Sequence, residues 1–336
     1  MSNFYENKSI LITGGTGSLG KELVKYYLKN HPEIKRLIIY SRDEQKQFQM
    51  EKEFPSSIHQ QLRFLIGDVR DLSRLERAMK DVHYVIHAAA MKHVHIAEYN
   101  PDECVKTNVG GAQNVIDACF KNNVERVVAL STDKACAPIN LYGATKLASD
   151  KLFIAANNIK GWNPIRFSVV RYGNVMGSNG SVIPFFQKAK KTGQIPITDP
   201  NMTRFNISLF EGVQMVVHAL EHAWGGELFV PKIPSYKIMD VAQAVAPDCE
   251  KKIIGIRPGE KVHEEMITAS DSFFTYDLGK YFAILPTTPK WKLEEFIHVF
   301  GAVRVKEGFS YTSNNNDYWE TVESLRLKIR DNLSEK

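Results

Sequence analysis

The sequence contains no long apolar run. A membrane span needs about 18 uncharged apolar residues, and no segment approaches that length. No apolar secretory segment is present near the first residues either. We therefore expect a cytoplasmic protein with no membrane partner. There is also no long basic block, because 43 Lys and Arg are spread among 38 Asp and Glu, for a net charge of +5. Nucleic-acid surfaces usually cluster their cations, so we expect no nucleic-acid partner.

Motifs for metals and disulfides are also missing. Cys104, Cys119, Cys136 and Cys249 form no C-x-x-C pair, and we expect reduced thiols. The pair His93 and His95 stands alone, without an H-E-x-x-H motif or an acidic ligand cluster. We therefore expect no metal site.

Alternation of short apolar runs with amphipathic segments is the main feature that is present. The apolar runs are residues 9–13, 36–40, 63–67, 84–90, 126–131 and 167–171. The amphipathic segments are 20–30, 43–54, 72–79, 110–122 and 142–157. Buried strands alternating with helices predict an α/β fold with a doubly wound, mostly parallel sheet.

The composition changes after residue 172 and becomes rich in Gly, Ser, Asn and Pro. We expect residues 1–172 to form a Rossmann domain, to which a helix and a strand in about 207–232 return. Residues 173–206 and 233–336 are expected to form a smaller substrate-binding cap. Such a cap would close a cleft over the carboxyl ends of the strands, where open α/β sheets bind ligands.

A glycine-rich turn, TGGTGSLG at residues 13–20, follows the first expected strand and opens the first helix. Gly14, Gly17 and Gly20 match G-x-x-G-x-x-G, and Gly15 with the last two matches G-x-G-x-x-G. Glycines here allow a tight turn and let backbone N–H groups approach a pyrophosphate at a helix N-terminus. In this strand–turn–helix context the motif predicts a dinucleotide site.

The end of the second strand discriminates between NAD and NADP. Arg42 and Ser41 are suited to a 2′-phosphate, whereas Asp43 would suit an NAD ribose unless it caps the following helix. We favour NADP. After the third strand, Asp68 and Val69 are placed to meet the adenine, although GDVRD also suits a plain Asx-type turn.

Four proton-active groups lie within residues 130–146, LSTDKACAPINLYGATK. Tyr142 and Lys146 are four residues apart and share one helical face. A nearby cation favours the phenolate of a tyrosine. Ser131 and Thr132 end the fifth strand just before this helix.

This combination resembles the extended short-chain dehydrogenase/reductase superfamily. The adjacent pair Asp133 and Lys134 further resembles the inverting, PseB-type UDP-N-acetylglucosamine 4,6-dehydratases of pseudaminic acid biosynthesis, on segments that include ILITGGTGS, LSTDKA, NLYGATK, ITDPNMTRF and IIGIRPGEK. In dehydratases acting on dTDP-glucose, the pair is Asp–Glu instead.

The resemblance implies a role for each catalytic residue. Tyr142 would take the proton of the carbon-4 hydroxyl, with Lys146 tuning it. Asp133 would assist the loss of water, and Lys134 would be the base at carbon 5. Lys134 can be a base only if its pKa falls from about 10.4 towards neutrality.

The resemblance also implies the binding residues and a homo-oligomer. For the cofactor they are Gly14, Thr16, Gly17, Ser18, Leu19, Gly20, Ser41, Arg42, Asp68, Val69, Ala88, Ala89, Ala90, Lys92, Asn108, Ser131, Thr132, Tyr142 and Lys146. For UDP-N-acetylglucosamine they are Lys92, Asn174, Ser181, Val182, Arg204, Arg257 and Glu260.

Three positions depart from the family pattern. Asn206 stands where the family has Trp, Asn179 where it has Arg, and His95 where it has Pro. We expect all three near the substrate. They leave open a retaining dehydratase or one that prefers another nucleotide. A UDP-sugar 4-epimerase and an NADP-sensing regulator without chemistry are the remaining alternatives.

Overall fold

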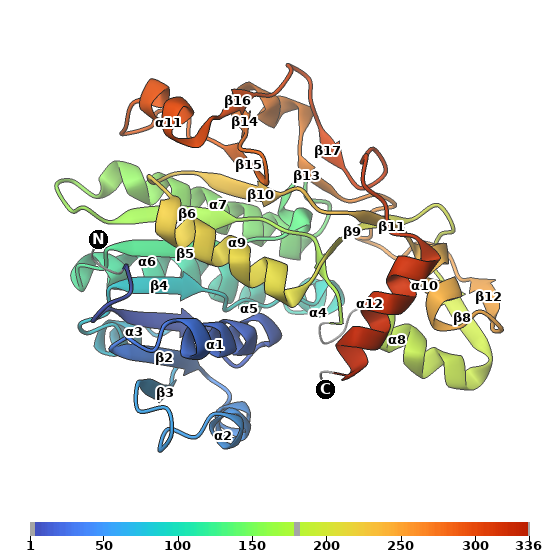
Figure 1. The fold of residues 1–336 in the computed structure, drawn as a ribbon, viewed down its shortest axis with the longest axis horizontal. Coiled ribbons are helices and arrows are strands. Elements are labelled where there is room, and N and C mark those ends of the chain that lie inside the picture. The colour runs from blue at the N-terminus through green and yellow to red at the C-terminus, as the bar shows by residue number, and fades with distance from the viewer. Residues whose placement is uncertain (1–3, 178–181, 335–336) are drawn as a thin grey trace.

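The computed structural model describes residues 4–177 and 182–334. Figure 1 shows one large twisted sheet flanked by helices, with a smaller group of helices and short strands beside it. Neither Ser181 nor Asn179 falls within the described residues.

Seven parallel strands form most of the large sheet, in the order β3-β2-β1-β4-β5-β6-β10. Their bounds are Ser9–Thr13 (β1), Arg36–Ser41 (β2), Leu62–Ile66 (β3), Tyr84–His87 (β4), Arg126–Leu130 (β5), Arg166–Val170 (β6) and Leu228–Pro231 (β10). The strand order reverses between β1 and β4, which opens a crevice at the carboxyl ends. The prediction of a doubly wound α/β sheet is confirmed.

Helices cover both faces of this sheet (Figure 1). On one face, α1 (Ser18–Asn30) and α9 (Leu209–His222) pack with the side chains of Leu23 and Val216 in one apolar cluster. On the other face, α3 (Leu72–Ala78), α6 (Gly111–Lys121) and α7 (Leu141–Ile159) share a second cluster. Covered on both sides, the central strands are mostly buried and apolar, and this made them recognisable in the sequence; the edge strand β3 is partly exposed.

Three antiparallel strands extend the sheet beyond β10, in the order β15-β14-β16. They are Thr275–Asp277 (β14), Tyr281–Ile284 (β15) and Val303–Arg304 (β16). The sequence assigned this region to the substrate-binding cap. The structure instead attaches it to the Rossmann sheet, because strands of two to four residues are too short to show a period of their own.

The smaller part of the molecule packs around Ile195, Ile197, Phe186 and Val241. It contains β7 (Asn174–Val175), α8 (Val182–Ala189), β8 (Gln194–Ile197), β9 (Thr203–Ile207), β11 (Ser235–Lys237), α10 (Ile238–Val245), β12 (Glu250–Ile253), β13 (Glu265–Ile267), β17 (Tyr311–Thr312) and α12 (Val322–Ser334). The remaining helices are α2 (Glu44–Glu53), α4 (Val94–Tyr99), α5 (Pro101–Val105), α11 (Leu293–Phe300) and short turns at Lys106–Gly110, Asp133–Ala135, Lys190–Thr192 and Ala269–Phe274.

In the described part of the chain, no helix combines the length and the apolar character that a membrane crossing requires. Among the same residues, no three His, Cys, Asp or Glu side chains come together in a way that could hold a metal ion.

Candidate active site

A cavity of about 1020 Å³ lies at the carboxyl ends of β1 to β6, between the large sheet and the smaller part. Most of the expected site residues line it: Gly14, Thr16, Gly17, Ser18, Leu19, Gly20, Ser41, Arg42, Asp68, Val69, Ala88, Ala89, Ala90, Lys92, Ser131, Thr132, Lys134, Tyr142, Lys146, Asn174, Val182, Arg204 and Glu260. The dinucleotide end and the sugar end of the predicted site are therefore parts of one cavity.

The glycine-rich turn leaves room for backbone groups and nothing larger. Gly14 has a φ of +67°, and a Cβ there would lie 2.8 Å from the backbone nitrogen of Ala89. A Cβ on Gly20 would lie 2.3 Å from the carbonyl oxygen of Gly15. Gly17 caps α1 without a side-chain hydrogen bond. The first N–H groups of α1 thus face the cavity uncapped by a side chain, which suits the pyrophosphate of a nicotinamide dinucleotide.

At the end of β2, Ser41, Arg42, Asp43 and Lys46 line the cavity, and Lys46 Nζ lies 3.1 Å from Asp43 Oδ2. The side chain of Asp43 accepts a hydrogen bond from the backbone N–H of Lys46 at 2.9 Å, so this carboxylate caps α2. Arg42 lies 3.8 Å from Asp68, and its side chain is largely exposed. Lys46, which sequence reasoning missed, also lines the cavity.

Asp68 makes the Asx-type turn that the sequence allowed and also lines the cavity. Its Oδ1 accepts the backbone N–H of Arg70 at 3.0 Å, and its Oδ2 accepts from the Arg70 guanidinium at 2.8 Å. Burial opposes the ionised form, but the bonds from Arg70 lower the pKa of Asp68. The turn therefore fixes an ionised carboxylate beside Val69.

Asn108 lies behind the cavity wall and is not among the residues that line it. Its Oδ1 accepts from Met91 N at 2.8 Å, and its Nδ2 donates to Thr145 Oγ1 at 3.0 Å. The buried amide therefore ties the loop after β4 to α7. Asn108 is connected to the cavity lining through Met91.

The two hydroxyls after β5 point in different directions. Ser131 Oγ donates to Asp150 Oδ2 at 2.6 Å, and Arg171 lies 3.3 Å from the same oxygen. Thr132 hydrogen-bonds Tyr142 and donates to Asp133 Oδ1 at 2.9 Å. Thr132 is thus the hydroxyl in contact with Tyr142, whereas Ser131 belongs to a buried network.

Tyr142 and Lys146 both come from the first turns of α7, and both are almost fully buried. Desolvation raises the pKa of Tyr142 to about 12, while the Lys134 ammonium and Thr132 act to lower it. Desolvation also lowers the pKa of Lys146, with Asp150 opposing. The sequence assigned the tuning of Tyr142 to Lys146; in the structure, Lys134 is a second cation that acts to lower the pKa of the phenol.

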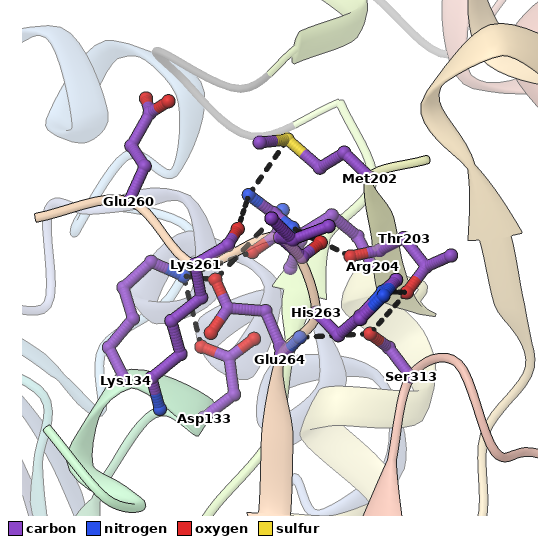
Figure 2. Close-up of polar contacts among 12 residues, drawn as sticks. Asp133, Lys134, Met202, Thr203, Arg204, Glu260, Lys261, His263, Glu264 and Ser313 are labelled. Atoms are coloured by element: carbon purple, nitrogen blue, oxygen red, sulfur yellow. Dashed lines mark hydrogen bonds and ion pairs between the residues drawn. The ribbon is translucent and has the colours of Figure 1, made fainter. Parts of the chain in front are cut away.

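Asp133 and Lys134 lie close to Glu264 and Arg204, which come from two distant parts of the chain (Figure 2). Lys134 Nζ lies 3.0 Å from Asp133 Oδ1 and 3.2 Å from Glu264 Oε1. Arg204 Nε lies 3.6 Å from the same Glu264 oxygen. Asp133 is fully buried behind Lys134 and does not itself line the cavity. Glu264, which sequence reasoning missed, does line it.

The charges in this cluster shift each other's pKa values. Burial raises the pKa of Asp133, which favours the protonated acid, although Lys134 opposes the shift. Burial would lower the pKa of Lys134, but Asp133 and Glu264 together raise it. This direction is opposite to the one that a neutral Lys134 base requires, because a second carboxylate, Glu264, lies beside the ammonium.

The loop of residues 257–261 closes the sugar end of the cavity. Asn140 caps α7 by accepting from Gly143 N at 2.8 Å, and its amide donates to the carbonyl of Gly259 at 2.9 Å. Lys261 Nζ donates to the carbonyl of Cys136 at 2.6 Å. Arg257 is exposed, lies 3.9 Å from Glu260 and is not a lining residue. Glu260, by contrast, lines the cavity.

Two of the three departures from the family pattern are described. Asn206 is buried in β9, where its Nδ2 donates to Glu320 Oε1 at 2.9 Å, and it does not line the cavity. Asn206 pairs with the lining residue Asn174 across β7 and β9, so it lies near the cavity without lining it, and its side chain anchors the segment before α12. His95 is exposed on α4, between the lining residues Val94 and Ile96.

Comparison with known proteins agrees with this geometry. A family model described as a polysaccharide biosynthesis protein matches residues 10–286. A UDP-N-acetylglucosamine 4,6-dehydratase (inverting) from Campylobacter jejuni subsp. jejuni serotype O:23/36 (strain 81-176) is 57% identical over 96% of this chain and 97% of its own length. A UDP-glucose 4-epimerase from Rickettsia canadensis (strain McKiel) is 42% identical over 83% of each chain. The X-ray structure of Pen from Bacillus thuringiensis superimposes with a TM-score of 0.89 at 36% identity, over 98% of this chain and 99% of that one.

Proposed function

Since the chain belongs to the family of polysaccharide biosynthesis proteins, we propose that it is an inverting UDP-N-acetylglucosamine 4,6-dehydratase. The product is the UDP-linked 4-keto-6-deoxy-L-arabino-hexose sugar, and the enzyme is a hydro-lyase. The observation that carries the proposal is the Asp133–Lys134 pair, 3.0 Å apart, whose lysine lines the same cavity as Tyr142 and whose carboxyl lies directly behind that lysine. Oxidation alone needs no such pair; removal of water does.

The first step is oxidation at carbon 4. Tyr142 takes the proton of the carbon-4 hydroxyl, and Thr132 holds the phenol in place. A bound nicotinamide dinucleotide would supply the hydride acceptor for carbon 4 and the hydride donor for carbon 6. Because Tyr142 is nearly inaccessible to water, charge on its oxygen is stabilised by Lys134 rather than by solvent.

The second step is loss of water across carbons 5 and 6, and it needs the pair in its neutral form. Burial favours the acid form of Asp133, so one proton can rest on Asp133 while the Lys134 amine faces the sugar. Lys134 then takes the carbon-5 proton, and Asp133 supplies the proton for the departing carbon-6 hydroxyl. The two neighbouring residues are thereby given opposite roles.

We propose NADP as the cofactor. Arg42 and Lys46 line the cavity at the end of β2, beside the Ser41 hydroxyl. Asp43 supports this choice, since its carboxylate is engaged at the N-terminus of α2. A 2′-phosphate would thus meet two cations and no free carboxylate from this turn.

The resemblance also supports four further parts of the proposal. We place the protein in the cytoplasm, as a homo-oligomer that binds UDP-N-acetylglucosamine, and at the first step of pseudaminic acid-type biosynthesis. Arg204, Glu260 and Asn174 would meet the nucleotide sugar, since all three line the cavity.

Proton NMR of the product formed in heavy water tests this proposal. An inverting dehydratase incorporates deuterium at carbon 5 and gives the L-arabino configuration. Retention at carbon 5 would assign the retaining alternative instead. A UDP-sugar isomer that has lost no water would assign a 4-epimerase, the activity for which the Rickettsia relative is named. Tyr142→Phe is the control, because it should give no product by any of these routes.

A further inference from the structure

We propose that Glu264 is the positioning carboxylate of Lys134, holding its Nζ at the cavity and stabilising the ammonium that forms when Lys134 takes the carbon-5 proton. The inference rests on the proposed function for the origin of that proton. The proposal adds Glu264, which lies 130 residues after Lys134 in the chain, to the acid–base residues Asp133 and Lys134.

The geometry around Glu264 is that of a fixed orienting group. Its Oε1 lies 3.2 Å from Lys134 Nζ, and its side chain is almost fully buried. Two bonds with Ser313 hold its backbone: Glu264 N donates to Ser313 Oγ at 2.9 Å, and Ser313 N donates to Glu264 O at 2.8 Å. These bonds tie the backbone of Glu264 to the residue that follows β17, so the side chain starts from a fixed position beside Lys134.

Glu264 is not needed to balance the positive charge of Lys134. Asp133 already lies 3.0 Å from Nζ, so Lys134 contacts two carboxylates (Figure 2). A buried ion pair contributes little net stability over an apolar replacement, so stability alone does not account for the second carboxylate. A base flanked by a carboxylate that orients it and supports its charged form is instead the arrangement of acid–base catalysis.

Charged and titratable groups from several elements surround Lys134 and Glu264. They are Asp133, Tyr142, Arg204, Tyr236, Lys261 and His263. Among the groups near Lys134, Glu264 and Asp133 favour its ammonium, and Arg204 opposes it. Removing the charge of Glu264 therefore lowers the pKa of Lys134, and the amine form appears at lower pH.

The test compares Glu264→Gln with Glu320→Gln. Both replace a buried carboxylate that contacts a lysine, but Glu320 contacts Lys328, outside the cavity. For Glu264→Gln we expect turnover to fall by about tenfold or more, with the ascending limb of the pH profile moved to lower pH and KM little changed. Glu320→Gln should keep the wild-type profile.

The inference would be overturned if the ascending limb of the pH profile stayed in place in folded Glu264→Gln. It would also be overturned if Glu320→Gln showed the same fall in turnover and the same shift of that limb. If Glu264→Gln does not fold, Glu264→Asp serves instead, because it keeps the negative charge but moves it one methylene away from Lys134. The ascending limb of the pH profile should then also move to lower pH, by a smaller amount than in Glu264→Gln. No shift in that variant counts against the inference.

A second measurement distinguishes failure of the proposed function from failure of the inference about Glu264. Isotope-detected NMR follows the titration of Lys134 without substrate, and the lysine should titrate at lower pH in Glu264→Gln. A wild-type chain that removes no water from UDP-N-acetylglucosamine overturns the function, while this titration still decides whether Glu264 sets the charge of Lys134. An unchanged titration overturns the inference in either case.

Discussion

Lys134 Nζ lies 3.0 Å from Oδ1 of Asp133, its neighbour in the chain. Adjacent side chains in a strand point to opposite faces. Here β5 ends at Leu130, and Thr132 caps a short turn at Asp133–Ala135. That turn brings both side chains to one side, with the carboxylate inside and the amine at the cavity wall. Consecutive residues thus bring a carboxyl and an amine into direct contact.

Replacing Lys134 separates the two half-reactions. In Lys134→Ala we expect dehydration to fall by about a hundredfold to ten-thousandfold, the usual contribution of a general base. Oxidation at carbon 4 should persist at a reduced rate, because Tyr142 remains. Rapid-mixing absorbance of the reduced nicotinamide, beside product analysis, measures both steps. Full turnover in this variant would contradict the assigned role.

The same variant should alter the pH dependence of oxidation. Burial raises the pKa of Tyr142 to about 12, and the Lys134 ammonium lowers it. Loss of that ammonium raises the pKa, so less phenolate exists at any given pH. The ascending limb of the oxidation step should move to higher pH. The matched control is Lys106→Ala, which removes an exposed cation paired with Asp102 and Glu103. A limb at the wild-type position in Lys134→Ala would rule out this coupling.

Cofactor choice should depend on Arg42. Arg42→Ala removes a guanidinium that we expect to bond the 2′-phosphate, so affinity for NADP should fall roughly ten- to a hundredfold. Affinity for NAD, which lacks that phosphate, should change little. Calorimetric titration of both dinucleotides gives the ratio. Equal losses for NAD and NADP would instead indicate that Arg42 supports the adenine through Asp68, 3.8 Å away.

Asn206 should affect stability and leave catalysis unchanged. Asn206→Ala removes the donor to buried Glu320 Oε1, at a cost of about 1–3 kcal/mol in the free energy of unfolding. Turnover per folded molecule should stay at the wild-type value, because Asn206 does not line the cavity. Urea unfolding with parallel activity measurements checks both. A changed KM for UDP-N-acetylglucosamine would return Asn206 to the substrate site.

Local pattern predicted most of the fold and much of the site. The strands β1 to β6 were recognisable because burial on both faces makes them continuously apolar. The site residues from Ser131 to Lys146 were recognisable because they lie within one short stretch beside the glycine-rich turn.

Glu264 and the strands beyond β10 were not predicted, since each depends on contacts between distant segments. The only sequence signal for Glu264 was the acidic pair Glu264–Glu265 after RPGEK, and nothing local distinguishes a buried glutamate from an exposed one. The partner of the Asn206 side chain was not predicted, for a similar reason. That partner is Glu320, 114 residues further along the chain.

Mass spectrometry of UDP-N-acetylglucosamine incubated with the purified protein, without added cofactor, tests the central claim most directly. We predict a product lighter by one water molecule, formed in many turnovers per protein molecule, because hydride taken from carbon 4 is returned to carbon 6. An unchanged mass after prolonged incubation, with the protein folded and supplied with NADP, would contradict the assignment of Asp133 and Lys134 as a dehydrating pair.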